Sequence, residues 1–367
     1  MTEDKATPPP PKKRYEWIDN ARIIAALLIV YVHLPDTFPN EEAAHSIIAA
    51  NIFTGSTIFG RVPFFLILAG YFLGRKITWH KAIDRAIWLF IPFCIWNIIT
   101  YVLYNYDSLG SLRFIDYIGS LPYMLGMTSI FSPDIIVYGT SPTWPVNAPT
   151  WFLRDIIILS LLTPILVRFK GVILSSLLII SAFTDFNIVS TSKVALAPYT
   201  CFFYCLGVCL CNFRIDDVYY IFSKRFTIIY VLVLATTTTV AVMMGSRGEN
   251  MLPATIIGPL LGAMLIAYSG VLVEKHLPKL SKKLVPCGPA CFLVFVLHSP
   301  ALSFIGPNLP HCIKDTALVW LLPILICAGI IALFLLMKKY TPWLMPYLGH
   351  MKVPKKEPVP TPAGKAS

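Results

Sequence analysis

Charged residues are scarce in this sequence, and their scarcity excludes most classes of soluble protein. Asp, Glu, Lys and Arg make up only 13% of the 367 residues, whereas a soluble domain of ordinary composition carries about 25%. Hydrophobic residues reach 56%, and the mean hydropathy is +0.69. Long apolar runs separated by short charged ones are typical of a polytopic membrane protein. The composition therefore excludes a soluble enzyme, a DNA-binding domain and a disulfide scaffold.

The sequence also lacks the common motifs of nucleotide and metal chemistry. It contains no P-loop, no glycine-rich dinucleotide turn and no H-E-x-x-H. Cys201, Cys205 and Cys209 recur at every fourth residue, but without the C-x-x-C pairs or the His and acidic partners that a metal site usually has. We interpret these cysteines as small residues that allow close helix packing, and we expect neither a disulfide core nor a metal site.

The apolar segments predict an all-α multi-pass fold with about ten transmembrane helices, because each is long enough to cross a bilayer core of about 30 Å. With both termini in the cytoplasm, the inner tails and loops hold about 23 Lys and Arg and the outer loops about four, as the positive-inside rule requires. The net charge of +11 thus reflects topology and not a nucleic-acid partner. The segments lie near residues 17–36, 53–73, 86–106, 149–168, 171–188, 195–212, 226–244, 252–273, 285–305 and 317–337.

The chain is divided into three regions. Residues 1–15 form a proline-rich polar tail that we expect to be disordered in the cytoplasm, and it leads into an uncleaved first span. Residues 16–340 are expected to form one membrane domain, within which 107–148 make a long extracytoplasmic loop. Residues 341–367 form a second cytoplasmic tail rich in proline and lysine.

The first span contains two ionisable residues, which are costly in a membrane unless they are paired or hydrated. Arg22 and His33 are almost three helical turns apart, so they project from one face about 16 Å apart along the axis. Asp19 can pair with Arg22 across one turn, and Asp36 is placed to orient the imidazole unless Pro35 ends the helix. The alternative is that Arg22 reaches the cytoplasmic head groups and His33 only marks the outer boundary.

Further motifs follow the first span in a definite order, at residues 62–73, 149–155, 202–207 and 292–298. Together with the first span, these motifs resemble acyltransferase family 3, a family of integral-membrane O-acyltransferases that act on surface glycans, over about residues 15–340. The chain departs from the family pattern at Ala69, where the family usually has Ser, and at Phe295, where it has Tyr.

The resemblance implies transfer of an acyl group, usually acetyl, from acyl-CoA to a hydroxyl of a cell-surface or lipid-linked glycan. Such a transfer needs a base for the hydroxyl proton and stabilisation of the oxyanion. His33 is the best-placed base, or it carries the acyl group itself, and Arg22 stabilises donor phosphate or developing negative charge. The implied partners are acetyl-CoA as donor substrate, the glycan acceptor and the lipid bilayer, with no permanently bound cofactor.

The donor site departs from the family pattern. The family often has Arg-x-x-Arg on the cytoplasmic approach to its third span, where this chain has Lys81 and Arg85 with Asp84 beside them. Lysine is a looser substitute, because only arginine binds a phosphate through two parallel hydrogen bonds. We take these two cations together with Arg75 and Lys76 as the candidate donor site, with an ordinary positive-inside loop as the alternative.

Four other residues are candidates for substrate binding. Arg61 either contacts substrate or forms a structural ion pair, and Trp151 either stacks on a sugar ring or belongs to the interfacial aromatic belt. Arg154 is expected to pair with another span and not with Asp155, because adjacent helical residues point about 100° apart. His298 is either a second acid/base or acceptor-binding group, or a satisfied core histidine.

A transporter or exporter of polysaccharide or lipid-linked sugar is the second hypothesis, because the same polar residues could line a path. Only the enzyme needs a thioester donor and a cytoplasmic phosphate-binding patch. The sequence shows no inverted repeat, which disfavours a secondary transporter. Because the glycan-modifying members of the family are concentrated in bacteria, we expect the protein in a bacterial cytoplasmic (inner) membrane.

Overall fold

Every regular element that the computed structural model describes is a helix, which confirms the predicted all-α class. The described residues are 14–34, 60–75, 77–104, 145–183, 198–215, 228, 232, 256, 258–310 and 320–349. The elements are α1 Glu16–Val32, α4 Arg61–Gly74, α5 Trp79–Tyr104, η2 Ala148–Thr150, α8 Trp151–Phe183, α10 Pro198–Leu210, α13 Gly258–His276, α14 Pro278–Leu284, η5 Val285–Ala290, α15 Cys291–Asn308, α17 Leu322–Tyr340, η7 Pro342–Leu344 and α18 Met345–Leu348.

Several helices have the length and composition of membrane spans, so the protein is a membrane protein. Four helical stretches in the described residues are long and apolar enough to cross a bilayer, namely Trp79–Tyr104, Ala148–Leu177, Pro278–Asn308 and Leu322–Tyr340. Ten spans and cytoplasmic termini remain predictions. Most of the expected span 226–244, most of the 107–148 loop, residues 1–13 and residues 350–367 lie outside the described residues. Residues 341–349, the beginning of the expected second tail, contain the short helices η7 and α18.

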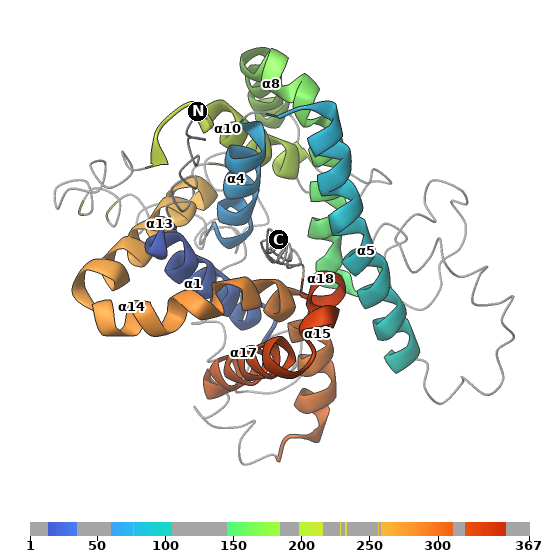
Figure 1. Cartoon of the computed structure of the whole chain (residues 1–367). Coiled ribbons are helices and arrows are strands. Elements are labelled where there is room, and N and C mark those ends of the chain that lie inside the picture. The colour runs from blue at the N-terminus through green and yellow to red at the C-terminus, as the bar shows by residue number, and fades with distance from the viewer. Residues whose placement is uncertain are drawn as a thin grey trace, which may run out of the picture.

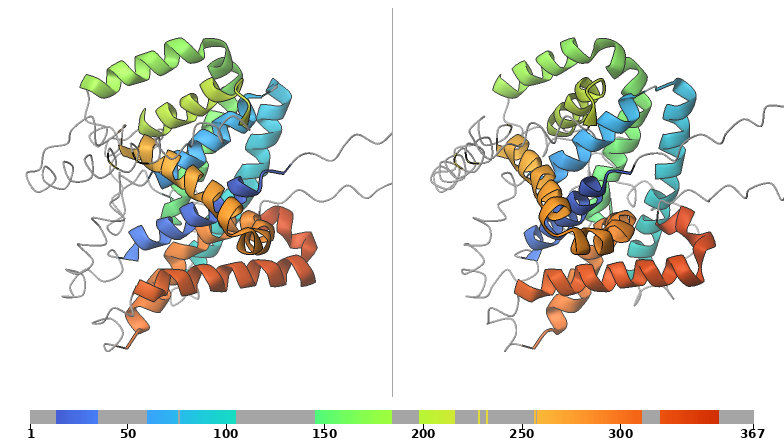
Figure 2. Two further views of the ribbon diagram at one scale, coloured as in Figure 1. Left: turned by 90° about the vertical axis from the view of Figure 1, so that its left-hand side faces the viewer. Right: turned by 60° about the vertical axis from the view of Figure 1, so that its left-hand side comes forward.

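Helix α8, Trp151–Phe183, consists of two helical arms that correspond to the expected segments at 149–168 and 171–188. The two expected segments meet at a bend where Phe169 has non-helical dihedral angles, φ −114° and ψ 16°. Figures 1 and 2 show the two arms of this helix in green, running in different directions. The polar residues Arg168 and Lys170 therefore mark a kink and not a loop.

Helix α1 lies at the centre of the fold. It contacts α4, α13, α14, η5, α15 and α17, and Figure 1 shows its dark blue ribbon between the orange helices and α4. Its close approach to α13 depends on Gly270, where a Cβ atom would meet the backbone oxygen of Trp17 and lie 2.8 Å from the Cβ of Ala21. Small residues thus let α1 sit deep in the molecule.

Glycine also joins α4 to α10. A Cβ at Gly70 would meet the backbone oxygen of Tyr204, and a Cβ at Gly207 would meet the backbone oxygen of Ile67. The two helices therefore touch backbone to backbone at two reciprocal points. Nearby, the Cβ of Cys211 would be 3.1 Å from a Cβ at Gly74, so the cysteine just after α10 also takes part in this close packing.

Candidate active site

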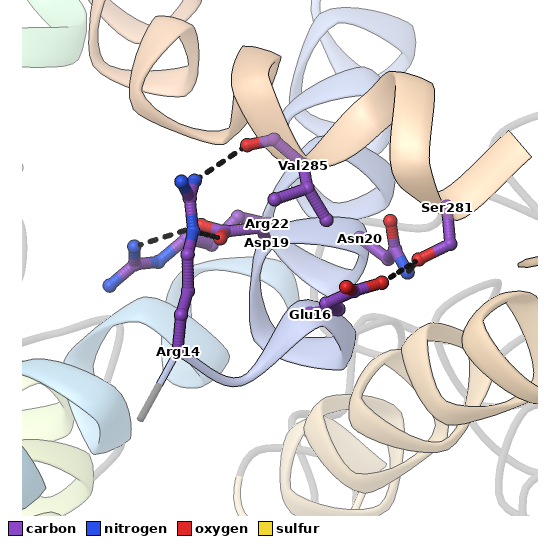
Figure 3. A network of polar contacts seen from close by, with 7 residues as sticks. All are labelled: Arg14, Glu16, Asp19, Asn20, Arg22, Ser281 and Val285. Atoms are coloured by element: carbon purple, nitrogen blue, oxygen red, sulfur yellow. Dashed lines mark hydrogen bonds and ion pairs between the residues drawn. The ribbon is translucent and has the colours of Figure 1, made fainter. Parts of the chain in front are cut away.

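A buried carboxylate organises the beginning of α1. Asp19 is 6% exposed, and its carboxylate accepts a 2.8 Å hydrogen bond from Nε of Arg14 and lies 3.6 Å from Nη1 of Arg22 (Figure 3). Nη2 of Arg14 donates to the backbone oxygen of Val285 at 2.6 Å. The predicted pairing of Asp19 with Arg22 is confirmed, and Arg14 extends it to the neighbouring element η5.

The same end of α1 is tied to α14 by a second set of polar contacts. Nδ2 of Asn20 donates to Oγ of Ser281 at 2.8 Å, and that hydroxyl donates to Oε2 of Glu16 at 3.1 Å (Figure 3). Gly288 of η5 lies against Asp19, because a Cβ there would be 2.7 Å from the carboxylate carbon. These contacts set the position of Arg22 relative to the elements around it.

Arg22 faces a large cavity together with two of the predicted donor-site cations. The cavity has a volume of about 810 Å³ and is lined by Arg22 of α1 and by Lys81, Asp84 and Arg85 of α5. Its volume lies within the range of about 300–1,000 Å³ that is usual for small-molecule sites. Arg22 is 36% exposed, so its charge is available to a ligand. The structure thus brings together three cations from two helices that are distant in the sequence.

Aromatic side chains form much of the remaining wall. Phe65, Phe152 and Phe295 line the cavity from α4, α8 and α15, with ring centroids 6.4 Å apart for Phe65 and Phe152 and 5.2 Å apart for Phe152 and Phe295. A cavity with cations at one place and an apolar wall elsewhere can bind an amphipathic ligand that carries negative charge at one end.

Two histidines meet beyond the apolar wall. The face of α1 that lines the cavity with Arg22, Ala26 and Ile29 continues to His33 one turn later. The ring centroids of His33 and His298 are 5.1 Å apart and the rings are inclined by 38°. Phe295, whose ring centroid lies 6.4 Å from that of His298, connects the pair to the cavity wall. Sequence reasoning had selected both histidines but had not placed them in contact.

The comparison with protein families gives one match. The model of the acyltransferase domain that defines acyltransferase family 3 matches residues 15–338. The chain belongs to acyltransferase family 3. This membrane acyltransferase therefore uses an acyl donor and an acyl acceptor. No curated protein and no solved structure gives a significant match to it.

Sequence reasoning missed one polar network of the acyltransferase, which joins α5, η2 and α15. Nδ2 of Asn97 donates to Oγ1 of Thr150 at 2.9 Å, and Oδ1 of Asn97 accepts from the backbone N–H of Asn147 at 3.0 Å. Nδ2 of Asn147 donates to the backbone oxygen of Val296 at 2.9 Å. Asn97 inside an apolar segment was the available signal, because a buried amide needs partners.

The candidates from the beginnings of α4 and α8 lie apart from the cavity. Arg61, Trp151 and Arg154 are not among the described residues that line it. The expectation that Arg154 does not pair with Asp155 is wrong, since Nη2 of Arg154 lies 3.3 Å from Oδ1 of Asp155. The long, flexible arginine side chain folds back over its neighbour, so the angle between the two Cα–Cβ bonds does not decide the contact.

The remaining candidates are placed as follows. Nη1 of Arg75 lies 3.1 Å from Oη of Tyr71, and Arg75 is not among the described residues that line the cavity. Lys76 and Asp36 lie outside the described residues.

Proposed function

We propose that this acyltransferase moves an acetyl group from acetyl-CoA to a hydroxyl of a cell-surface or lipid-linked glycan. The observation that carries the proposal is the shared cavity of Arg22, Lys81 and Arg85, on the helix face that leads to His33. The donor enters from the cytoplasm and the glycan reaches the His33 end. The protein is a multi-pass protein of a bacterial inner membrane, with one membrane domain between two cytoplasmic tails.

The cations of the cavity fit the phosphates of the donor. Arg22 and Arg85 can each bind a phosphate through two parallel hydrogen bonds, while Lys81 acts as a point charge. Asp84 offsets part of the positive charge, which leaves a net cationic lining at this end. Arg75, which is not among the described residues that line the cavity, contributes to the positive potential of the cytoplasmic approach and not to direct phosphate contacts.

The distance between Arg22 and His33 assigns a role to each residue. They lie about 16 Å apart along the helix axis, so Arg22 is too far from His33 to stabilise an oxyanion there. It therefore binds donor phosphate, and the extended pantetheine arm of CoA crosses the aromatic stretch to bring the thioester to His33. Asp19 positions the Arg22 guanidinium through their ion pair.

His33 acts as the general base in the transfer. Its imidazole removes the proton of the acceptor hydroxyl, whose oxygen attacks the thioester carbonyl carbon. The C–S bond breaks, and the CoA thiolate takes the proton from the imidazolium. In the alternative route the imidazole itself attacks the thioester, and the acyl-histidine then passes the acyl group to the hydroxyl. The role of Asp36 as an orienting partner of the ring stays a prediction, because this residue lies outside the described residues. The acceptor-binding roles of Arg61, Trp151 and Arg154 also stay predictions, since these residues are not among the described residues that line the cavity.

The experiment that tests the proposal measures CoA release by the purified protein in nanodiscs with acetyl-CoA, where water takes the place of the acceptor hydroxyl and the products are acetate and free CoA. Wild type is expected to release free thiol, and His33→Ala is expected to lose the activity by about 100- to 10,000-fold, the usual contribution of a general base. His276→Ala is the matched control, because His276 is an exposed histidine at the end of α13 and does not line the cavity.

Two results would contradict the proposal. Normal turnover by His33→Ala would remove this residue from the mechanism. The absence of both thiol release and an acetyl-CoA-dependent thermal shift in wild type would point to the alternative function, a transporter of polysaccharide or lipid-linked sugar. Membership of an acyltransferase family favours the enzyme.

A further inference from the structure

We propose that His298 is a positioning residue for His33: its Nε2 accepts the N–H of the His33 ring and so fixes which nitrogen of His33 faces the acceptor hydroxyl. The proposal rests on the function of His33 as the base. It concerns the tautomer and orientation of that base, which decide whether the ring can take a proton at all.

The hydrogen-bond geometry determines the tautomer of His298. Nδ1 of His298 lies 3.0 Å from the backbone oxygen of Val294. A carbonyl oxygen only accepts, so Nδ1 carries the hydrogen and donates it. His298 is 0% exposed, and an imidazolium without an ionic partner is costly at such a site, so the neutral ring fits best. In the neutral ring Nε2 is then a hydrogen-bond acceptor.

That acceptor needs a donor. Nε2 of His298 is buried and has no hydrogen-bond partner among the described residues. Two rings contact His298, those of His33 at 5.1 Å and Phe295 at 6.4 Å between centroids, and only the imidazole of His33 carries an N–H. A small rotation of the His33 ring, which lies just beyond the last residue of α1, completes the hydrogen bond.

The backbone around His298 is held in place from outside its helix. Pro300 has no N–H, so the oxygen of Val296, four residues earlier, lacks its usual helical hydrogen bond. Nδ2 of Asn147 replaces the missing donor at 2.9 Å, and the backbone of Asn147 is in turn held by Asn97. The proline in α15 is thus compensated, and the turn that carries His298 has a fixed position.

The pair explains how the half-buried His33 is prepared to act as the base. A neutral acceptor keeps the hydrogen of His33 on the nitrogen that faces His298, which leaves the lone pair of the other nitrogen for the acceptor hydroxyl. When His33 takes the hydroxyl proton, the N–H that points to His298 becomes a charge-assisted donor, and its hydrogen bond strengthens. The proton on the reacting nitrogen then passes to the CoA thiolate.

The test compares two substitutions at His298. His298→Leu replaces the imidazole by an apolar side chain of similar size, which has neither nitrogen. His298→Gln places an amide near the position of Nε2, and its oxygen can still accept the N–H of His33. We expect kcat of His298→Leu to fall about 10- to 100-fold, the usual effect of losing an orienting partner. The KM for acetyl-CoA should stay within about twofold. His298→Gln should recover most of the lost kcat.

The outcomes separate this inference from the proposed function. If His33→Ala retains activity, the role of His33 itself fails. If His33→Ala is inactive while His298→Leu keeps the wild-type kcat, or if Leu and Gln lose kcat equally, only the positioning role is overturned. His276→Gln, at the exposed end of α13, is the matched control and should leave both kcat and KM unchanged.

A measurement on wild type keeps the inference testable if the His298 variants do not fold. Solid-state NMR of ¹⁵N-histidine-labelled protein in lipid distinguishes a protonated ring nitrogen from an unprotonated one. We expect His298 to carry its hydrogen on Nδ1 and His33 to donate to its Nε2. A hydrogen on Nε2 of His298 would overturn the proposal.

Discussion

The two ends of the α1 face differ in water access and in charge. Around Asp19 and Arg22 the side chains are charged, and the Arg22 side chain is 36% exposed. At the other end, His33 contacts His298, which is 0% exposed and held by a backbone oxygen. The exposed charges suit the binding of a phosphorylated donor, whereas a half-buried imidazole beside a buried one suits proton transfer. In the proposed mechanism, one helix face thus separates donor binding from proton transfer.

This comparison predicts that substitutions at the two ends change different kinetic constants. The largest effect after loss of His33 is expected at Arg85. Arg85→Ala should raise the KM for acetyl-CoA about tenfold or more, because a charge-assisted hydrogen bond contributes about 1.5–3 kcal/mol. At saturating donor kcat should stay close to wild type, since the lost contact is made equally in the ground and transition states. Steady-state kinetics of thiol release measures both constants.

Arg75→Ala is the control for that experiment. Like Arg85→Ala, it removes one positive charge, here just after α4. Arg75 contacts Tyr71 and is not among the described residues that line the cavity. Its KM should change little. An equal rise of KM in both variants would mean that the general positive potential matters and that the cavity contact does not.

A smaller effect is expected from Gly288→Ala at the charged end. The new Cβ would lie 2.7 Å from the carboxylate carbon of Asp19, so the carboxylate that pairs with Arg22 must shift. Overpacking of this kind typically costs about 1–3 kcal/mol of unfolding free energy. A lower Tm in detergent would show this loss, and the KM for the donor should rise with it.

Gly329→Ala is the control, because a Cβ at Gly329 meets nothing within 4 Å. An unchanged Tm for Gly288→Ala would contradict the packing around Asp19.

The smallest expected effect is at the buried end. Asn147→Ala removes the donor to the oxygen of Val296, which Pro300 leaves without a helical hydrogen bond. Loss of one buried hydrogen bond should destabilise the protein by about 1–3 kcal/mol and lower kcat without changing the KM for acetyl-CoA. Thermal unfolding and thiol release test both effects.

Asn308→Ala is the matched control on the same helix. Nδ2 of Asn308 donates to the oxygen of Phe304 at 2.7 Å, but the residue is exposed, so water can replace its hydrogen bond. A loss of kcat in Asn308→Ala as large as that in Asn147→Ala would show that the effect is not specific to the His298 turn.

The features that could be predicted from the sequence depend on the geometry of a single helix. The 3.6-residue period is enough to place Arg22 and His33 on one face and to pair Asp19 with Arg22. The contact between His33 and His298 depends on how α1 and α15 pack, which no spacing within one helix encodes. The expectation for Arg154 and Asp155 was wrong for a different reason. Helical geometry gives the direction of the Cα–Cβ bonds, but the arginine side chain is long enough to bend back to the carboxylate of its neighbour.

The reciprocal glycine contacts of α4 and α10 have a consequence for the width of the cavity. Both helices line the cavity, α4 through Phe65 and Leu68 and α10 through Tyr204. Because Gly70 and Gly207 already place backbone against backbone, these helices cannot come closer together. The width of the cavity on this side is therefore set by the side chains on a rigid frame, and widening it would require a smaller residue in place of Phe65 or Leu68.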